Sequence, residues 1–256
     1  MRVENSFIPV RGVGERTERK LWRRGVQTWD DFDGSVPGPA SPDRVYEFID
    51  TAEDRLDAGD AQFFAETFPS GCQWRLYENF RDGACFLDIE TTGLSAHRDD
   101  VTVVSCHRDG DTRTYVRGRD LTGEQLAGEL ADARLLVTFN GKRFDAPFLE
   151  ESFDLDVDLP HIDLMYPCRR LDLTGGLKEI ERTLDIDRDR PDLSGTDAVR
   201  LWREYERGDE GALETLVSYN RDDTENMRRL LDIVTGRLHE SVFEAPVEEY
   251  TDGRNG

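Results

Sequence analysis

Two acidic residues follow an apolar run in a pattern that suggests chemistry. Residues 84–89 have the composition of a strand, and Asp88 and Glu90 stand two positions apart at its end. Because side chains alternate between the faces of a strand, these two carboxylates project to the same side. Adjacent carboxylates beside apolar residues are costly unless a cation neutralises them. The alternative is that the strand ends at Asp88 and both acids reach water.

A third acid, Asp145, comes shortly after another predicted strand. The chain leaves residues 135–139, turns at Asn140-Gly141 and enters a helix expected over 143–153. This helix carries Asp145 among aromatic and aliphatic side chains, where a carboxylate again needs a partner. Alternatively, Asp145 caps the start of the helix, since Asp is favourable at that end.

A fourth acid, Asp223, lies within an apolar stripe of the helix expected over 210–238. One face of that helix carries Leu216, Asn220, Asp223, Met227, Leu230 and Val234. Tyr219 lies one turn before Asp223, so the phenol and the carboxylate are neighbours. Asp222 falls instead on a solvent face beside Ser218. The alternative is a core tyrosine next to an ordinary Asp that is bonded to backbone.

Together the four acids predict a cation site made of oxygen ligands. The set contains no Cys or His, and hard carboxylate oxygens suit Mg²⁺ or Mn²⁺. Two such ions, roughly 4 Å apart, can clamp the attacking and leaving oxygens of a phosphodiester displacement.

The elements that must position these acids indicate a mixed α/β domain. Strands are expected over 84–89, 101–106, 112–116 and 135–139, and helices over 124–132, 143–153, 177–184, 197–206 and 210–238. Three consecutive strands followed by a helix, a strand and further helices are typical of a sheet covered by helices. We expect the helices over 143–153 and 210–238 to cover its hydrophobic face.

The composition is strongly acidic throughout the chain. The 256 residues carry 33 basic and 55 acidic side chains, a formal net charge of −22, and lysine occurs only as Lys20, Lys142 and Lys178. Abundant carboxylates with little lysine are what a salt-rich cytosol favours, where the Debye length is on the order of 3 Å at 1 M. We therefore expect a halophilic, haloarchaeal-type source.

Other features argue against a secreted or membrane protein. The four cysteines form no CxxC pair and have no metal-finger spacing. No run approaches the ~18 apolar residues that a membrane span needs, and the amino terminus does not resemble a signal peptide. We expect a cytoplasmic protein with reduced thiols.

Three segments resemble the exonuclease motifs of the DEDD superfamily, the RNase H-like 3′–5′ exonucleases. These are Leu87-Asp88-Ile89-Glu90-Thr91-Thr92-Gly93-Leu94, residues 140–149, and Tyr219-Asn220-Arg221-Asp222-Asp223. The likeness covers about residues 84–235 and is closest to the YprB-type predicted exonucleases. Segments 161–165, 176–181 and 193–198 resemble connecting segments of that group.

The resemblance implies a role for each matching residue. Asp88, Glu90, Asp145 and Asp223 match the four metal-binding acids. Tyr219 matches the tyrosine that orients the attacking water in the tyrosine branch, because Ser218 stands where the histidine branch has its histidine. Thr91 and Leu94 match positions that contact the sugar and base of the terminal nucleotide, and Asn140 and Phe144 are expected to line the same groove.

The amino-terminal segment resembles a helix-hairpin-helix. Its Gly12-Val13-Gly14 turn could offer backbone N–H groups to a DNA phosphate, and five arginines flank it. The equally open alternative is a small helical domain that packs and binds nothing.

We therefore expect a small all-α, helix-hairpin-helix-like domain over 1–80, an RNase H-like α/β exonuclease domain over 81–240, and an acidic flexible tail over 241–256. The implied activity is two-metal hydrolysis from a 3′ end with Mg²⁺ or Mn²⁺, releasing nucleoside monophosphates, with single-stranded DNA as the favoured partner. The alternatives are an exoribonuclease or structure-specific endonuclease with the same site, and a non-catalytic nucleic-acid-binding module.

Overall fold

The computed structural model describes residues 1–35 and 41–247. Its contacts divide the chain into two compact units, one formed by 1–81 together with 233–256 and the other by 82–232. Among the described residues, no helix is both long and apolar enough to cross a membrane.

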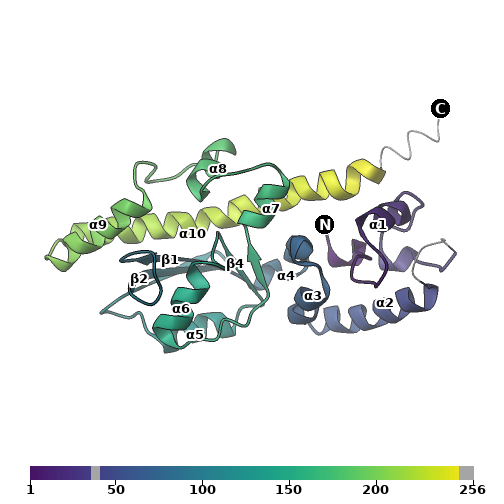
Figure 1. Ribbon diagram of the computed structural model, residues 1–256, viewed down its shortest axis with the longest axis horizontal. Coiled ribbons are helices and arrows are strands. Elements are labelled where there is room, and N and C mark those ends of the chain that lie inside the picture. Colours follow the sequence, from purple (N-terminus) through teal and green to yellow (C-terminus); the bar gives the residue numbers. More distant parts are fainter. Residues whose placement is uncertain (36–40, 248–256) are drawn as a thin grey trace. The chain divides into compact units, whose positions relative to one another are not determined.

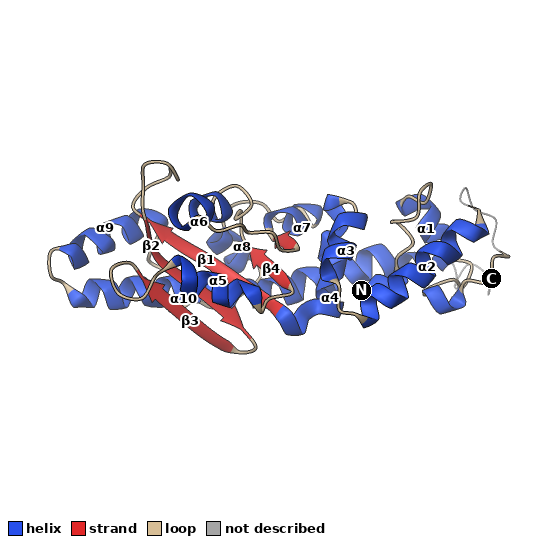
Figure 2. Cartoon of the chain, turned by 90° about the horizontal axis from the view of Figure 1, so that it is seen from below, coloured by secondary structure: helices blue, strands red, loops and turns tan. Residues whose placement is uncertain are grey.

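A five-stranded mixed sheet forms the centre of the 82–232 unit (Figure 2). The strands are β1 (Ala84–Thr91), β2 (Val101–Arg108), β3 (Asp111–Val116), β4 (Leu135–Thr138) and β5 (His161–Asp163), in the order β3-β2-β1-β4-β5. β1 pairs antiparallel with β2 and parallel with β4, which in turn pairs parallel with β5. This confirms the predicted mixed α/β class, although β5 was not expected as a strand.

Helices cover both faces of the sheet (Figure 1). On one face, α5 (Gly123–Ala131) and α6 (Asp145–Phe153) pack on Cys85, Leu87 and Ile89 of β1. On the other, α9 (Gly195–Glu206) and α10 (Glu210–His239) pack on Val103 and Val116. The expectation that the 143–153 and 210–238 helices share one face was therefore wrong, because each face of β1 needs its own apolar cover. The alternate residues, Asp88 and Glu90, project toward α10.

Two short helices complete this unit between β5 and α9. They are α7 (Met165–Arg170) and α8 (Leu177–Thr183). The segment from α8 to α9 returns the chain to α10, so it brings residues 178–188 beside the middle of that helix.

The other unit is helical, with α1 (Glu15–Trp22), α2 (Pro42–Asp57), α3 (Ala61–Thr67) and α4 (Tyr77–Phe80). Among the described residues, 3₁₀ turns lie before, between and after these helices, at Val3–Asn5, Trp29–Asp31, Ser70–Leu76 and Arg81–Gly83. The helix-hairpin-helix expectation is not confirmed. α1 follows Gly14, but residues 8–12 before it are turns and not a helix.

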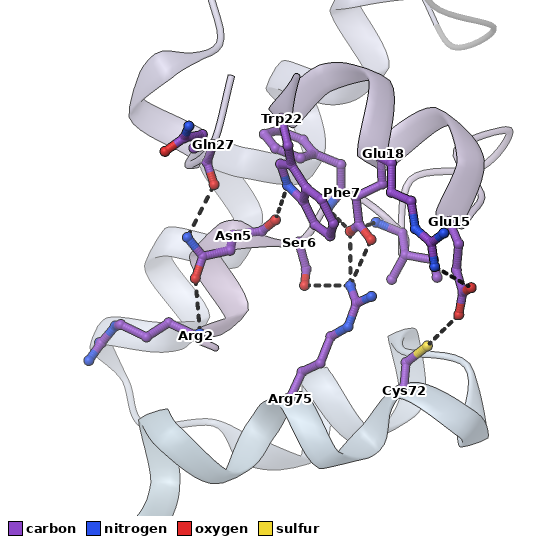
Figure 3. Close-up of polar contacts among 12 residues, drawn as sticks. Arg2, Asn5, Ser6, Phe7, Glu15, Glu18, Trp22, Gln27, Cys72 and Arg75 are labelled. Atoms are coloured by element: carbon purple, nitrogen blue, oxygen red, sulfur yellow. Dashed lines mark hydrogen bonds and ion pairs between the residues drawn. The ribbon is translucent and has the colours of Figure 1, made fainter. Parts of the chain in front are cut away.

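A buried ion pair holds those turns to α1 (Figure 3). Glu18 and Arg75 are both 0% exposed, and Nη1 of Arg75 lies 2.9 Å from both carboxylate oxygens of Glu18. Phe7 and Ile8 donate their backbone N–H groups to the same carboxylate at 2.8 and 3.2 Å, and Arg75 also donates to Ser6 Oγ at 2.8 Å. Burial raises the pKa of Glu18, while Arg75 and these donors oppose that rise. The carboxylate thus fixes the loop that precedes α1.

The end of the chain differs from the expected tail. Residues 240–244 continue α10 as a π-helical turn, and Val242 is buried. Burial of the apolar Val242 side chain orders residues 240–244, although their acidic composition suggested a frayed segment. The remainder of the predicted tail, 248–256, lies outside the described residues.

Candidate active site

Asp88 and Glu90 lie on the central strand, facing α10. They pair across β1 and β2 with Ser105 and Val103, and the register shifts immediately after Glu90. Glu90 is only 8% exposed and Asp88 is half-buried, so the strand does not end at Asp88 with both acids in bulk water. Asn220 on α10 donates from Nδ2 to Oδ2 of Asp88 at 2.7 Å, which fixes one side of that carboxylate.

A rigid turn between β4 and α6 places Asp145. Asn140 adopts a left-handed conformation with φ of 63°, which Asn tolerates better than most residues. The Asp163 carboxylate accepts the N–H groups of Asn140 and Lys142 at 2.8 and 3.3 Å. Only glycine fits at 141, because a Cβ there would lie 2.3 Å from Oγ1 of Thr138. Asp145 is the first residue of α6, 4% exposed, and is not its N-cap, which is Phe144.

α10 contributes Asp223 and Tyr219 from the expected stripe. Both are buried, at 8% and 6% exposure, and the Tyr219 hydroxyl is hydrogen-bonded to Asp223. Burial and the nearby acids raise the pKa of Tyr219, so its phenol stays protonated and can act as a donor. Asp223 also pairs with Arg188, which in turn pairs with Glu181.

The Asp222 side chain is more buried and more fully hydrogen-bonded than a solvent-face position would predict. Its carboxylate is half-buried and accepts the backbone N–H groups of Asp189 and Arg190 at 2.9 and 3.1 Å. Asp222 therefore anchors the loop that carries Arg188, while Asp223 faces the other acids.

The acids form one electrostatically unbalanced cluster. One oxygen from each of Asp88, Glu90 and Asp223 lies within 4.8 Å of the others. Burial and mutual repulsion raise the pKa values of Asp88 and Glu90 well above their ordinary range, and burial raises that of Asp145 to about 7. Burial also raises the pKa of Asp223, although Arg188 opposes this. An all-oxygen donor set with surplus negative charge fits a hard divalent cation.

All nine residues predicted for the site line a single pocket of about 670 Å³. They are Asp88, Glu90, Thr91, Leu94, Asn140, Phe144, Asp145, Tyr219 and Asp223. Leu94 is 87% exposed at its edge, and Thr91 donates from Oγ1 to the carbonyl of Gly93 at 2.5 Å. The structure thus brings together segments that are separated by more than 130 residues.

Several further residues reach the site that sequence reasoning did not identify. Arg188 and Lys178 lie against the ring of Tyr219, with Cζ and Nζ at 5.6 and 4.5 Å from its centroid. The sequence offered little indication of these two residues. Lys178 falls in segment 176–181, which resembles only a connecting segment of the exonuclease group. Asn220 was assigned only to the apolar stripe. Three arginines also line the pocket, Arg200 and Arg203 of α9 and its C-cap residue Arg207. Nothing in the sequence pointed to them beyond their spacing of three and four residues.

The chain is similar to several known proteins. The sequence profile RNase_H_2 of the RNase_H superfamily matches residues 85–235. Among solved structures, the chain is similar to a family B DNA polymerase from Pyrobaculum calidifontis at 18% identity, covering 59% of this chain and 24% of the polymerase with a TM-score of 0.49. It thus spans about a quarter of that polymerase.

Two smaller nucleases are also similar. One structure, described as the apo form of the nuclease, has 24% identity and a TM-score of 0.47, covering 66% of this chain and 80% of that one. Brucella melitensis NrnC with bound Mg²⁺ has 22% identity and a TM-score of 0.46, covering 68% and 83%. A search of curated proteins finds no match.

The profile match covers more than half of the chain, including β1 and most of α10, from which Asp88, Glu90, Tyr219 and Asp223 come. The chain therefore belongs to the RNase_H superfamily.

Proposed function

We propose that this protein is a 3′–5′ exonuclease that hydrolyses single-stranded nucleic acid, with DNA favoured, and releases nucleoside monophosphates. The observation that carries the proposal is the convergence of four acids and a tyrosine from β1, α6 and α10 into one open pocket. Their order and spacing resemble the tyrosine branch of the DEDD exonucleases, and more narrowly the YprB-type group.

Asp88, Glu90, Asp145 and Asp223 would hold two divalent ions, Mg²⁺ or Mn²⁺. When bound, such ions supply Lewis acidity and lower the pKa of a coordinated water. Their positive charge would also offset the repulsion that raises the pKa values of Asp88 and Glu90. The proposal thus gives a physical reason for burying so many carboxylates together.

The chain's own residues would position the reacting groups. Tyr219, kept neutral by its raised pKa, would orient the attacking water through its hydroxyl. Asn220 holds the Asp88 carboxylate, and Arg188 holds that of Asp223. The pocket residues Thr91, Leu94, Asn140 and Phe144 would receive the sugar and base of the terminal nucleotide.

One experiment separates this proposal from its alternatives. End-labelled single-stranded DNA, duplex DNA and RNA are each incubated with the protein in Mg²⁺, Mn²⁺ or EDTA. We expect a metal-dependent ladder that shortens from the 3′ end, fastest on single-stranded DNA. A ladder on RNA alone would indicate an exoribonuclease, and discrete internal products an endonuclease. Binding without any product would support a non-catalytic module.

The acidic composition supports a second part of the proposal, adaptation to a salt-rich cytosol. With a net charge of −22, the protein repels itself and a polyanionic substrate at low ionic strength. We expect both thermal stability and hydrolysis rate to rise from dilute buffer toward molar KCl. Maximum stability and activity in dilute buffer would contradict it.

A further inference from the structure

One wall of the active-site pocket is basic, and the proposed metal site does not account for it. Arg200, Arg203 and Arg207 of the α9 segment line the same pocket as the four acids. Arg200 and Arg203 are three residues apart on one face of α9, and Arg207 is the C-cap residue that follows the helix. The opposite face, with Leu201 and Trp202, is buried in the hydrophobic core, so the arginine face is directed outward.

Two of the three arginines carry uncompensated charge. Arg200 donates from Nη1 to both carboxylate oxygens of Glu204 at 2.9 Å and lies 3.4 Å from Asp197. The side chains of Arg203 and Arg207 are exposed, and neither guanidinium forms an ion pair or hydrogen bond with any described residue. Arg203 lies in the last turn of α9, and Arg207 follows four residues later as the C-cap. In a chain with 55 acidic side chains, two adjacent unpaired guanidinium groups on a pocket wall leave room for an external anion.

The rest of the pocket limits which part of a substrate these arginines can meet. The acids surround the reacting phosphate in the proposed function, and the residues from β1 and the β4–α6 turn receive the terminal nucleotide. The remaining lining comes from α9. A strand whose 3′ end lies among the acids must leave the pocket, and the arginine face offers its phosphates a favourable surface.

We infer that Arg203 and Arg207 bind successive backbone phosphates on the 5′ side of the cleaved bond. This inference rests on the proposed function for the direction of the strand. The recognised group is the phosphate and not the base, because guanidinium groups pair with phosphate oxygens whatever the sequence. The arginines therefore favour a substrate with at least two further nucleotides over a dinucleotide, and they counter the repulsion of the acidic chain.

Binding measured without turnover tests the inference directly. Fluorescence anisotropy of a 5′-labelled (dT)12 is recorded in EDTA for the intact protein and for Arg203→Gln, Arg207→Gln and the double variant. Each substitution should weaken binding about three- to tenfold at about 50 mM KCl, and should reduce the slope of log K against log[KCl] by about 0.7 between about 50 and 200 mM. Arg182→Gln is the matched control. Arg182 is exposed on α8 and does not line this pocket, so its loss should change affinity less than twofold.

Hydrolysis rates on two substrates then distinguish an effect on strand binding from an effect on the chemical step. The p-nitrophenyl ester of thymidine 5′-monophosphate has no phosphate on the 5′ side of the cleaved bond. Its kcat/KM should therefore be unchanged in all three variants, while KM for (dT)12 rises. Unchanged affinity and salt slope would overturn the inference, as would an equal loss on both substrates. If the unmodified protein cleaves neither substrate, the proposed function fails. The anisotropy result then still decides whether the arginines bind the strand.

Discussion

The two units each bury acidic side chains, but they treat them differently. In the helical unit Glu18 is completely buried with one arginine and two backbone N–H donors, so its charge is satisfied within the protein. The same arginine also donates to the hydroxyl of Ser6. In the other unit four carboxylates share two nearby cationic side chains, Arg188 and Lys178. The first arrangement specifies a loop conformation. The second leaves negative charge for a ligand to neutralise.

This difference shows what identifies a functional acidic residue in a chain that contains so many of them. Burial is common to both clusters, and burial raises the pKa of Glu18 as it does that of Asp145. What separates them is the number of carboxylates per positive charge and the opening of the pocket. Variants of the two clusters should therefore change different properties.

Asp88→Ala should give the largest effect. Removing one carboxylate from the crowded site should lower the hydrolysis rate by at least about 10³-fold, since a metal ligand is lost. The melting temperature in EDTA should stay the same or rise, because repulsion in the metal-free protein is relieved. Glu214→Gln, an exposed position on the same helix as Asp223, is the control and should leave both unchanged. Near-normal hydrolysis by Asp88→Ala would exclude the metal assignment.

Glu18→Gln should show the opposite pattern. Removing the charge leaves Arg75 buried and uncompensated, which should cost about 3–5 kcal/mol in the free energy of unfolding. Hydrolysis measured well below the melting temperature should be unaffected. The double variant Glu18→Gln, Arg75→Met should regain much of the lost stability, as urea unfolding can measure. A stable single variant would mean that this pair is dispensable to the fold.

Tyr219→Phe should lower the hydrolysis rate by about 10²-fold while the concentration of Mg²⁺ needed for half-maximal rate stays constant. The substitution removes a hydroxyl that orients water and bonds Asp223, but no metal ligand. Asp223→Asn should be more severe and should shift the Mg²⁺ requirement as well. If the two variants behave alike in a metal titration, Tyr219 acts through the metal site and not on the water.

The stability of the metal-free protein should fall as pH rises through the range in which Asp145 titrates. Its pKa of about 7 lies above its ordinary 3.8, so the folded state retains a proton that the unfolded chain loses first. The folded state is thus favoured at low pH, and this contribution is lost between about pH 4 and 7. Asp145→Asn should raise the melting temperature in EDTA by about 5 °C at pH 8 and little at pH 4. Equal shifts at both pH values would show that its charge is not the cause.

The smallest effect is expected at Asp222. Asn at this position retains one oxygen to accept from Asp189 or Arg190, so Asp222→Asn should slow hydrolysis less than about threefold. Asp222→Ala should cost about 1–2 kcal/mol in stability by freeing the loop that carries Arg188. Should Asp222→Asn be inactive and Asp223→Asn active, the alignment of the third motif would be shifted by one residue.

The inward orientation of the acids could be predicted from the sequence because each lies in a regular element whose periodicity is visible. Alternation along β1 and the helical stripe of α10 were sufficient to place Asp88, Glu90 and Asp223 on inward faces. β5 was missed because three residues, His161–Asp163, are too few for a pattern. The contact of Arg188 with Asp223 joins residues 35 positions apart through an irregular loop, which no local rule predicts. The assignment of α6 and α10 to one sheet face failed because periodicity gives the apolar side of a helix but not its partner.

The turn between β4 and α6 has a consequence for the chemical lifetime of the protein. Asn-Gly is the pair in which the backbone nitrogen after Asn most readily attacks the side-chain amide, giving a succinimide and then aspartate or isoaspartate. The site cannot exchange Gly141 for a larger residue. The N–H of Gly141 is buried and donates to Oγ1 of Thr138 at 3.1 Å, so the nitrogen that would attack already has a hydrogen-bond partner. Deamidation of Asn140 would add a fifth carboxylate to the lining of the pocket.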